Sequence, residues 1–120
     1  MPRVVTGCKC WHMRDCEVFY PKANFDRVVE ALPRGAEAIF IFGEIDCREG
    51  ILLAVERLKY HDLTAGIQAA QDVYLRRLHR LRRQKHMTIY IHPAPPVMDI
   101  TRPVVRQWNC LLYTSPSPRD

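Results

Sequence analysis

The fold is decided by residues 38–48, which read AIFIFGEIDCR. Residues 38–42 are continuously apolar and rich in residues that favour strands, so they predict a strand covered on both faces, as in a parallel sheet. Gly43 then permits an unusual turn into a polar run that includes Asp46 and Arg48. Functional groups collect at the carboxyl ends of strands in such sheets, so we expect a site in this loop.

Helical and strand patterns alternate after this segment. We expect a helix over residues 51–58, a break at residues 60–62 and a long helix over residues 64–84. Residues 87–91 predict a second strand, which the proline-rich segment from His92 to Pro96 ends. Residues 97–109 predict a loop and a helix with Pro103 in its first turn. This alternation predicts an α/β fold with parallel strands joined by right-handed crossovers.

The part before the first strand is less regular. Residues 1–22 mix glycine, proline, basic residues and cysteines, and predict a loop with one weak strand over residues 18–20. Asn24 precedes apolar residues at helical spacing, so we expect it to cap a short helix that residues 33–35 end.

The composition is that of one small globular domain: 120 residues, 48% hydrophobic and 26% charged. No apolar run approaches the roughly 18 residues of a membrane span, and residues 1–7 lack the apolar core of a signal peptide. These features favour a chain without a membrane span.

The net charge of +5 comes largely from the basic run at residues 76–86. Five apolar residues share the opposite face of the same predicted helix: Ile67, Ala70, Tyr74, Leu78 and Leu81. Neither stacking aromatics nor a nucleic-acid motif accompanies the arginines. We therefore interpret them as a solvated helix face and expect no nucleic-acid partner.

The last eleven residues, 110–120, read CLLYTSPSPRD and differ in character from what precedes them. They resemble the translation of a transposase-type sequencing adapter; a natural Ser/Pro-rich tail is the alternative. We therefore expect a partial domain over residues 1–109 and an adapter-derived tail over 110–120. Ser115 and Ser117 are the only serines, so residues 1–109 contain none.

Residues 39–109, with GEIDCR at 43–48, resemble the central part of SGNH or GDSL-type hydrolases and their polysaccharide-modifying relatives. The resemblance implies a three-layer α/β/α, flavodoxin-like fold and acyl-ester hydrolysis or transfer. It also implies a serine nucleophile from a first sequence block and an Asp-x-x-His pair from a last block. This chain holds neither, since Asp99 is followed at the third position by Arg102.

In that family the third block usually reads Gly-x-Asn-Asp, and the glycine N–H and asparagine side chain stabilise the oxyanion. Gly43 and Asp46 match this block, whereas Ile45 stands where asparagine belongs. The resemblance implies substrate-binding or oxyanion roles for four residues: Gly43, Asp46, Arg48 and His92. A buried ion pair or a hydrogen-bond set that fixes the loop is the alternative for Asp46 and Arg48. His92 could instead orient its loop through a backbone hydrogen bond.

The cysteines allow two rival sites. The segment with Cys8, Cys10, His12 and Cys16 supplies ligand types that zinc prefers, but its spacing does not fit the usual zinc sites, and we expect no metal or cofactor. Disulfides among Cys8, Cys10, Cys16 and Cys47 stay open. A cysteine nucleophile at Cys47 is disfavoured, because neighbouring carboxylates oppose its thiolate.

The function that follows is that of a partial SGNH-like protein, an ester hydrolase or acyl-transfer protein. Its substrate would be a carbohydrate or other small-molecule ester, and this chain alone would be inactive. The alternatives are a non-catalytic ligand-binding or interaction domain and a small metal-binding protein. A partial sheet should also leave one apolar edge and one uncovered face, which makes the isolated chain prone to aggregation.

Overall fold

Two strands pair in parallel along one side of the fold: β1 (Glu37–Ile41) and β2 (Thr88–His92). They were located in a computed structural model, which describes residues 3, 5, 8–14, 20–95 and 99–114. In their register Ile39 faces Tyr90, and Ile41 faces His92. Three helical segments connect the strands: η2 (Asp46–Gly50), α2 (Ile51–Glu56) and α3 (Leu63–Lys85). The predicted parallel alternation of strands and helices is confirmed.

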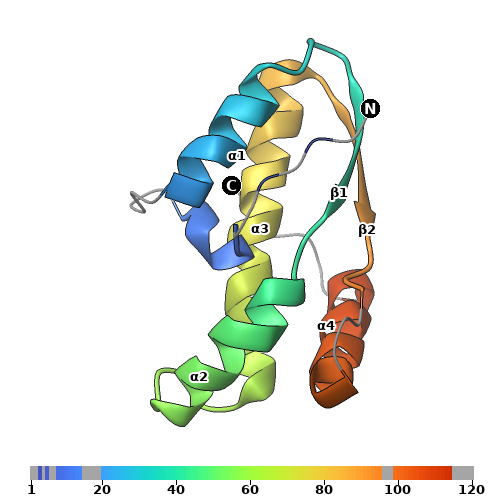
Figure 1. Ribbon diagram of the computed structural model, residues 1–120. Helices are drawn as coiled ribbons and strands as arrows, with labels where there is room; N and C mark the ends of the chain where they lie inside the picture. Colours follow the sequence, from blue (N-terminus) through green and yellow to red (C-terminus); the bar gives the residue numbers. More distant parts are fainter. Residues whose placement is uncertain (1–2, 4, 6–7, 15–19, 96–98, 115–120) are drawn as a thin grey trace.

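The long helix α3 packs along one face of the sheet (Figure 1). It begins where the Asp62 carboxylate accepts the backbone N–H of Ala65 at 2.8 Å, and it ends at His86, whose φ of 51° is left-handed. The stripe predicted from helical spacing is buried at all five positions: Ile67, Ala70, Tyr74, Leu78 and Leu81. The prediction of which helix face is buried was therefore correct, and the arginines of α3 lie off this face.

The sheet is covered on one face only. Phe40 is buried and packs against Phe25 with ring centroids 6.3 Å apart, on the side that carries α1 and α3 (Figure 1). The opposite face is open: Ile39 is 67% exposed, Ile41 54% and Tyr90 53%. Cover on both faces is thus wrong for this chain, whereas the uncovered face expected of a partial sheet is present.

The N-terminal part is more helical than its composition predicts. It forms η1 (Cys10–Met13) and α1 (Tyr20–Glu30), and residues 18 and 19 of the expected weak strand lie outside the described part. Asn24 lies inside α1 rather than at its cap. Pro21 in the first turn is compatible with an earlier start, because the first N–H groups of a helix have no partner within it. Burial of Phe25 and Val29 then stabilises the helix.

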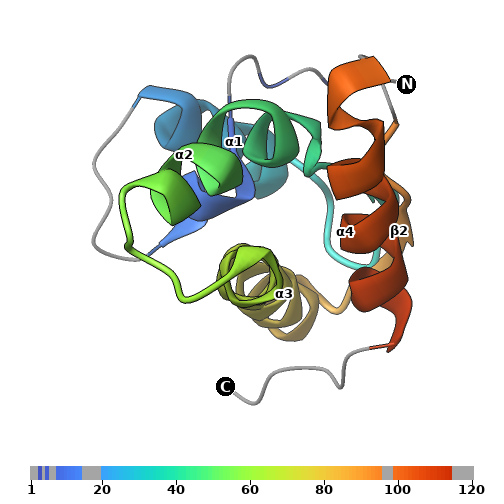
Figure 2. The same cartoon turned by 90° about the horizontal axis from the view of Figure 1, so that it is seen from below.

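Helix α4 (Arg102–Thr114), which follows η3 (Asp99–Thr101), packs beside α3 (Figure 2) and lies below β2 in the view of Figure 1. Pro103 lies in its first turn as predicted. The Gln71 amide donates to the Trp108 carbonyl at 2.8 Å, and Trp108 is fully buried. The helix crosses the expected boundary after residue 109, and Leu112 is buried. The adapter origin of residues 110–120 stays a prediction, and residues 115–120 lie outside the described part.

The chain is therefore a mixed α/β structure with a two-stranded parallel sheet. Over the described residues, its helices lack the combination of length and apolar character that a membrane crossing needs.

Candidate functional site

The loop after β1 begins at a glycine that no other residue could replace without strain. Gly43 is buried with a φ of 113°, and a Cβ at this position would lie 2.5 Å from Cε2 of the Trp108 indole. Its carbonyl accepts the backbone N–H of Cys47 at 3.0 Å, which starts the helical turn of η2. Gly43 therefore lets the chain leave the sheet directly beneath the core tryptophan.

Asp46 points inward from η2 and is only 1% exposed. Its carboxylate accepts the backbone N–H of Cys10 at 2.8 Å and that of Trp11 at 3.2 Å. Burial raises the pKa of Asp46, while these two N–H groups and the nearby Lys9 oppose the rise. The hydrogen-bond set predicted as an alternative is present, and it ties the loop to η1.

Arg48 points away from Asp46. Its guanidinium forms ion pairs with Glu44 at 2.9 Å and with Glu49 at 3.0 Å. The hydrogen bond and the charge of Glu44 raise the pKa of Arg48 above its ordinary value. The partners of Arg48 are therefore its neighbours in sequence, and the buried ion pair considered with Asp46 is not formed.

His92 is exposed at the end of β2, and its Nδ1 lies 2.7 Å from the carbonyl oxygen of Pro93. This is the local loop-orienting contact considered from the sequence. Farther along the same loop, the Asn109 amide accepts the Ala94 N–H at 2.8 Å and donates to the Ala94 carbonyl at 3.1 Å. From the sequence, Asn109 was expected only at a helix end, and no motif predicted this pair of hydrogen bonds, called here the Asn109 clamp.

The four predicted site residues are thus close in the fold but do not converge on one cavity. The strand register places Gly43 just beyond the end of β1 and His92 at the end of β2, because Ile41 pairs with His92. Asp46 turns toward η1, and Arg48 turns toward solvent.

The buried cysteines are not placed for catalysis. Cys8, Cys10 and Cys47 are buried free thiols, so they form no disulfide with one another. Burial raises the pKa of Cys8 and of Cys47 to about 12, with Asp46 adding to both shifts, which keeps both thiols protonated near neutral pH. Over the described residues no three His, Cys, Asp or Glu side chains form a metal-binding group. Cys16 of the zinc hypothesis lies outside them.

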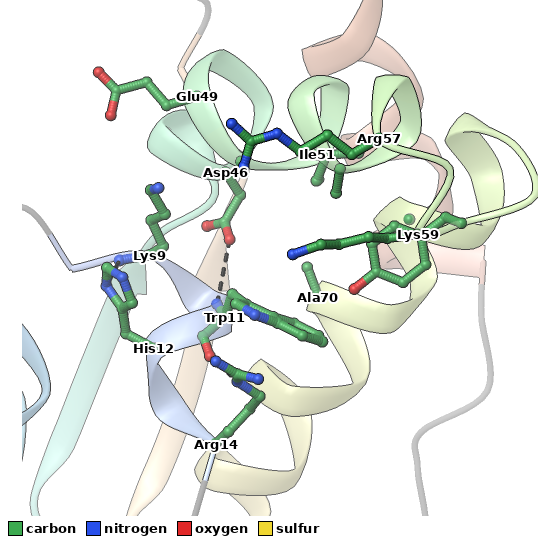
Figure 3. Close-up of a pocket in the computed structure, with 14 residues that line it drawn as sticks. Lys9, Trp11, His12, Arg14, Asp46, Glu49, Ile51, Arg57, Lys59 and Ala70 are labelled. Carbon is green, nitrogen blue, oxygen red and sulfur yellow. Dashed lines mark hydrogen bonds between the residues drawn. The ribbon is translucent and has the colours of Figure 1, made fainter. Parts of the chain in front are cut away.

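A cavity of about 320 Å³ lies between η1, η2, α2 and α3 (Figure 3). Of the four predicted substrate-binding or oxyanion residues, only Asp46 lines it, and His12 of the zinc hypothesis lines it as well. Six other wall residues were not expected as site residues: Lys9, Trp11, Arg14, Arg57, Lys59 and Tyr60. The sequence does combine basic and aromatic residues at 9–14 and at 57–60, but these segments meet only through the tertiary fold.

A second hollow, of about 900 Å³, follows β1 on the side of α1. Its wall includes the whole strand, Gly43 and apolar residues of α1 such as Val28 and Val29. Within the described part of the chain, β1 pairs with β2 alone, so its other edge is open to this groove.

These features are the basis for any functional assignment, because no protein-family model, curated protein or solved structure matches the chain.

Proposed function

We propose that this chain is the central part of an SGNH-like domain in an ester hydrolase or acyl-transfer protein. Its substrate would be a carbohydrate or other small-molecule ester. The observation that carries the proposal is the parallel pairing of β1 and β2, which brings the Gly43 loop and the His92 loop to one edge of the sheet. That edge is where open parallel sheets hold their functional groups.

The shape of the loop supports the same proposal. Gly43 has the backbone conformation and the close approach that only glycine tolerates, as expected of a block in which a glycine N–H contacts an oxyanion. Asp46 fixes the turn that follows, through two backbone hydrogen bonds. In this proposal Gly43 contacts substrate, Asp46 positions the loop, and Arg48 and His92 lie on the rim.

The incomplete sheet also fits a larger domain. The open edge of β1 borders an apolar groove in which a further parallel strand could pair. The exposed face at Ile39, Ile41 and Tyr90 has the apolar character that a second helical layer would cover. A three-layer α/β/α fold is therefore the architecture that we propose for the complete domain.

We expect that this chain alone does not hydrolyse esters, because it lacks a suitable nucleophile. Residues 1–109 contain no serine, and the Cys8 and Cys47 thiols are held protonated by burial. In a longer protein, a serine from a first block and an Asp-x-x-His pair from a last block would have to meet the Gly43 loop.

The test is to read the source transcript through both ends of this sequence and to express its longest reading frame. Both proteins are then assayed with p-nitrophenyl acetate and with an acetylated carbohydrate. We expect hydrolysis by the longer protein, its loss on replacing the first-block serine with alanine, and none from the 120-residue chain. A folded longer protein without the two missing blocks, or without activity, would disprove the enzyme proposal.

A non-catalytic binding domain is the second candidate. The observation in its favour is the cavity between η1 and α2, which Gly43, Arg48 and His92 do not line. Ligand binding by a longer protein that lacks ester-cleaving activity would favour this alternative.

A further inference from the structure

The cavity between η1, η2, α2 and α3 is hollow because the side chains at its floor are small. Gly50, Ala54, Gly66 and Ala70, which have small side chains or none, line it. Gly66 also allows close packing, since a Cβ there would lie 3.0 Å from Cγ2 of Ile51. Its volume of about 320 Å³ is within the range of small-molecule sites.

Positive charge dominates the wall of this cavity. Four permanent cations line it from different parts of the chain: Lys9, Arg14, Arg57 and Lys59. In Figure 3 the Arg57 and Lys59 side chains reach back over the cavity from the end of α2, opposite η1. Two carboxylates share the wall, but Asp46 already accepts two backbone N–H groups and Glu49 already pairs with Arg48.

Arg57 and Lys59 carry charges that no other described residue neutralises. Over the described residues, neither side chain has a hydrogen-bond or ion-pair partner, and both residues are exposed. Two unneutralised cations at the mouth of a hollow attract anions, and a guanidinium can hold a tetrahedral oxyanion through two parallel hydrogen bonds.

Two aromatic side chains also line the cavity. The rings of Trp11 and Tyr60 meet edge to face with centroids 6.2 Å apart, and both line the cavity. The Arg14 guanidinium lies 4.3 Å from the centre of the Trp11 ring and donates its Nε–H to the Trp11 carbonyl at 3.1 Å. Arg14 thereby orients the indole, which leaves a flat apolar surface next to the cations.

We propose that this cavity binds a small ring-bearing monoester of phosphate or sulfate. The oxyanion lies between Arg57 and Lys59, and the ring packs against Trp11 and Tyr60. Of the four residues assigned to the proposed ester chemistry, only Asp46 lines this cavity, and its carboxylate is occupied by two backbone N–H groups. The binding proposal therefore does not depend on that chemistry. Phosphate and sulfate share the tetrahedral oxyanion that the site recognises, and direct comparison of their esters distinguishes them.

The test uses the 120-residue chain and isothermal titration calorimetry with phenyl phosphate, phenyl sulfate, inorganic phosphate and phenol. We expect one of the two phenyl esters to bind more tightly than inorganic phosphate, and phenol to show no binding. Arg57→Gln and Lys59→Gln should each weaken binding of that ester about fivefold. The matched control is Arg82→Gln, an exposed arginine on α3 outside the cavity, which should not change the affinity.

A second readout locates the ligand. In a ¹H–¹⁵N spectrum the indole N–H signal of Trp11 should move on titration, whereas that of the fully buried Trp108 should not. Tyr60→Leu should weaken the phenyl ester more than inorganic phosphate, because only the ester has a ring to pack. Tighter binding of the phosphate ester identifies a phosphate site, and the reverse identifies a sulfate site.

Three results would overturn the proposal. The first is that neither phenyl ester binds the native chain, and the second is that phenol binds as tightly as the esters. The third is that Arg57→Gln, Lys59→Gln and Arg82→Gln all weaken binding equally, which would mean a nonspecific effect of net charge. Because Arg57 and Lys59 are exposed, their replacement should leave the far-ultraviolet circular dichroism spectrum unchanged. A weaker affinity then reflects the lost side chain and not unfolding of the variant.

Discussion

The Asp46 carboxylate accepts the backbone N–H of Cys10 at 2.8 Å and so joins two segments that are 36 residues apart in sequence. A second bond from Trp11, at 3.2 Å, makes the contact bidentate. The loop after β1 and the short helix η1 are therefore fixed relative to each other. Because η1 also carries Trp11 and Arg14, this one buried side chain positions both the Gly43 loop and one wall of the basic cavity.

Removing this carboxylate should destabilise the chain. Asp46→Ala leaves two buried or half-buried N–H groups without an acceptor, which should lower the free energy of unfolding by about 2 kcal/mol. Urea denaturation followed by circular dichroism measures the change. Asp72→Ala, on the exposed side of α3, is the matched control and should change it by less than about 0.5 kcal/mol. Equal stability of the native chain and Asp46→Ala would show that the contact does not stabilise the fold.

The same side chain predicts an unusual pH dependence. Burial raises the pKa of Asp46 in the folded chain, so the folded state holds the proton more tightly than the unfolded state. The contribution of this group to stability therefore falls as the pH rises from about 4, the pKa range of an unperturbed aspartate, through the raised value. Asp46→Asn has no such proton to lose.

We therefore expect the stability of Asp46→Asn relative to the native chain to improve as the pH rises from about 4 to 7. Urea denaturation at several pH values measures it. Asp46→Ala, which also lacks a titrating group at this position, should change with pH in parallel with Asp46→Asn. Curves for the native chain and Asp46→Asn that stay parallel would rule out a raised pKa.

Gly43 and Gly35 form a matched pair for testing the turn after β1. Both have positive φ, 113° and 79°, but a Cβ at Gly43 would meet the Trp108 indole, whereas one at Gly35 would have nothing within 4 Å. Gly35→Ala should cost only the backbone strain, about 1 kcal/mol, and Gly43→Ala about 3 kcal/mol or more. Thermal unfolding compares them. A similar loss in both variants would mean that contact with Trp108 does not require glycine.

The elements predicted well from the sequence are those whose own residues show a clear local pattern. The α3 stripe from Ile67 to Leu81 repeats at helical spacing, and β1 is a short apolar run between turn residues, so both were placed to within a residue or two. Helix α1 was mispredicted at its start, because Pro21 and its neighbours indicate a loop unless the burial of Phe25 is known.

The candidate site was predicted only in part, for a related reason. Gly43 and Asp46 stand out because they follow a strand, and the structure gives both a definite role in the loop. Trp11 and Tyr60 meet only after η1 packs against α3, and no local pattern encodes that contact. The Asn109 clamp on Ala94 likewise depends on how α4 returns to the sheet.

The open sheet face yields the last prediction. Ile39 and Ile41 alternate outward on β1 beside Tyr90, and a flat apolar sheet face with a free strand edge favours self-association. The double variant Ile39→Thr/Ile41→Thr keeps β-branched side chains, so it should preserve the strand while lowering the apolar exposure. Sedimentation velocity at increasing concentration should show larger species for the native chain and a monomer for the variant.

The control for this experiment is Ile100→Thr, because Ile100 is 80% exposed in η3, away from the sheet. It removes a comparable exposed apolar side chain and should leave the self-association of the native chain unchanged. If Ile100→Thr lowers self-association as much as the sheet variant does, overall surface hydrophobicity is the cause. If the native chain is itself monomeric throughout, the exposed face does not need cover, and the support it lends to a missing helical layer is lost.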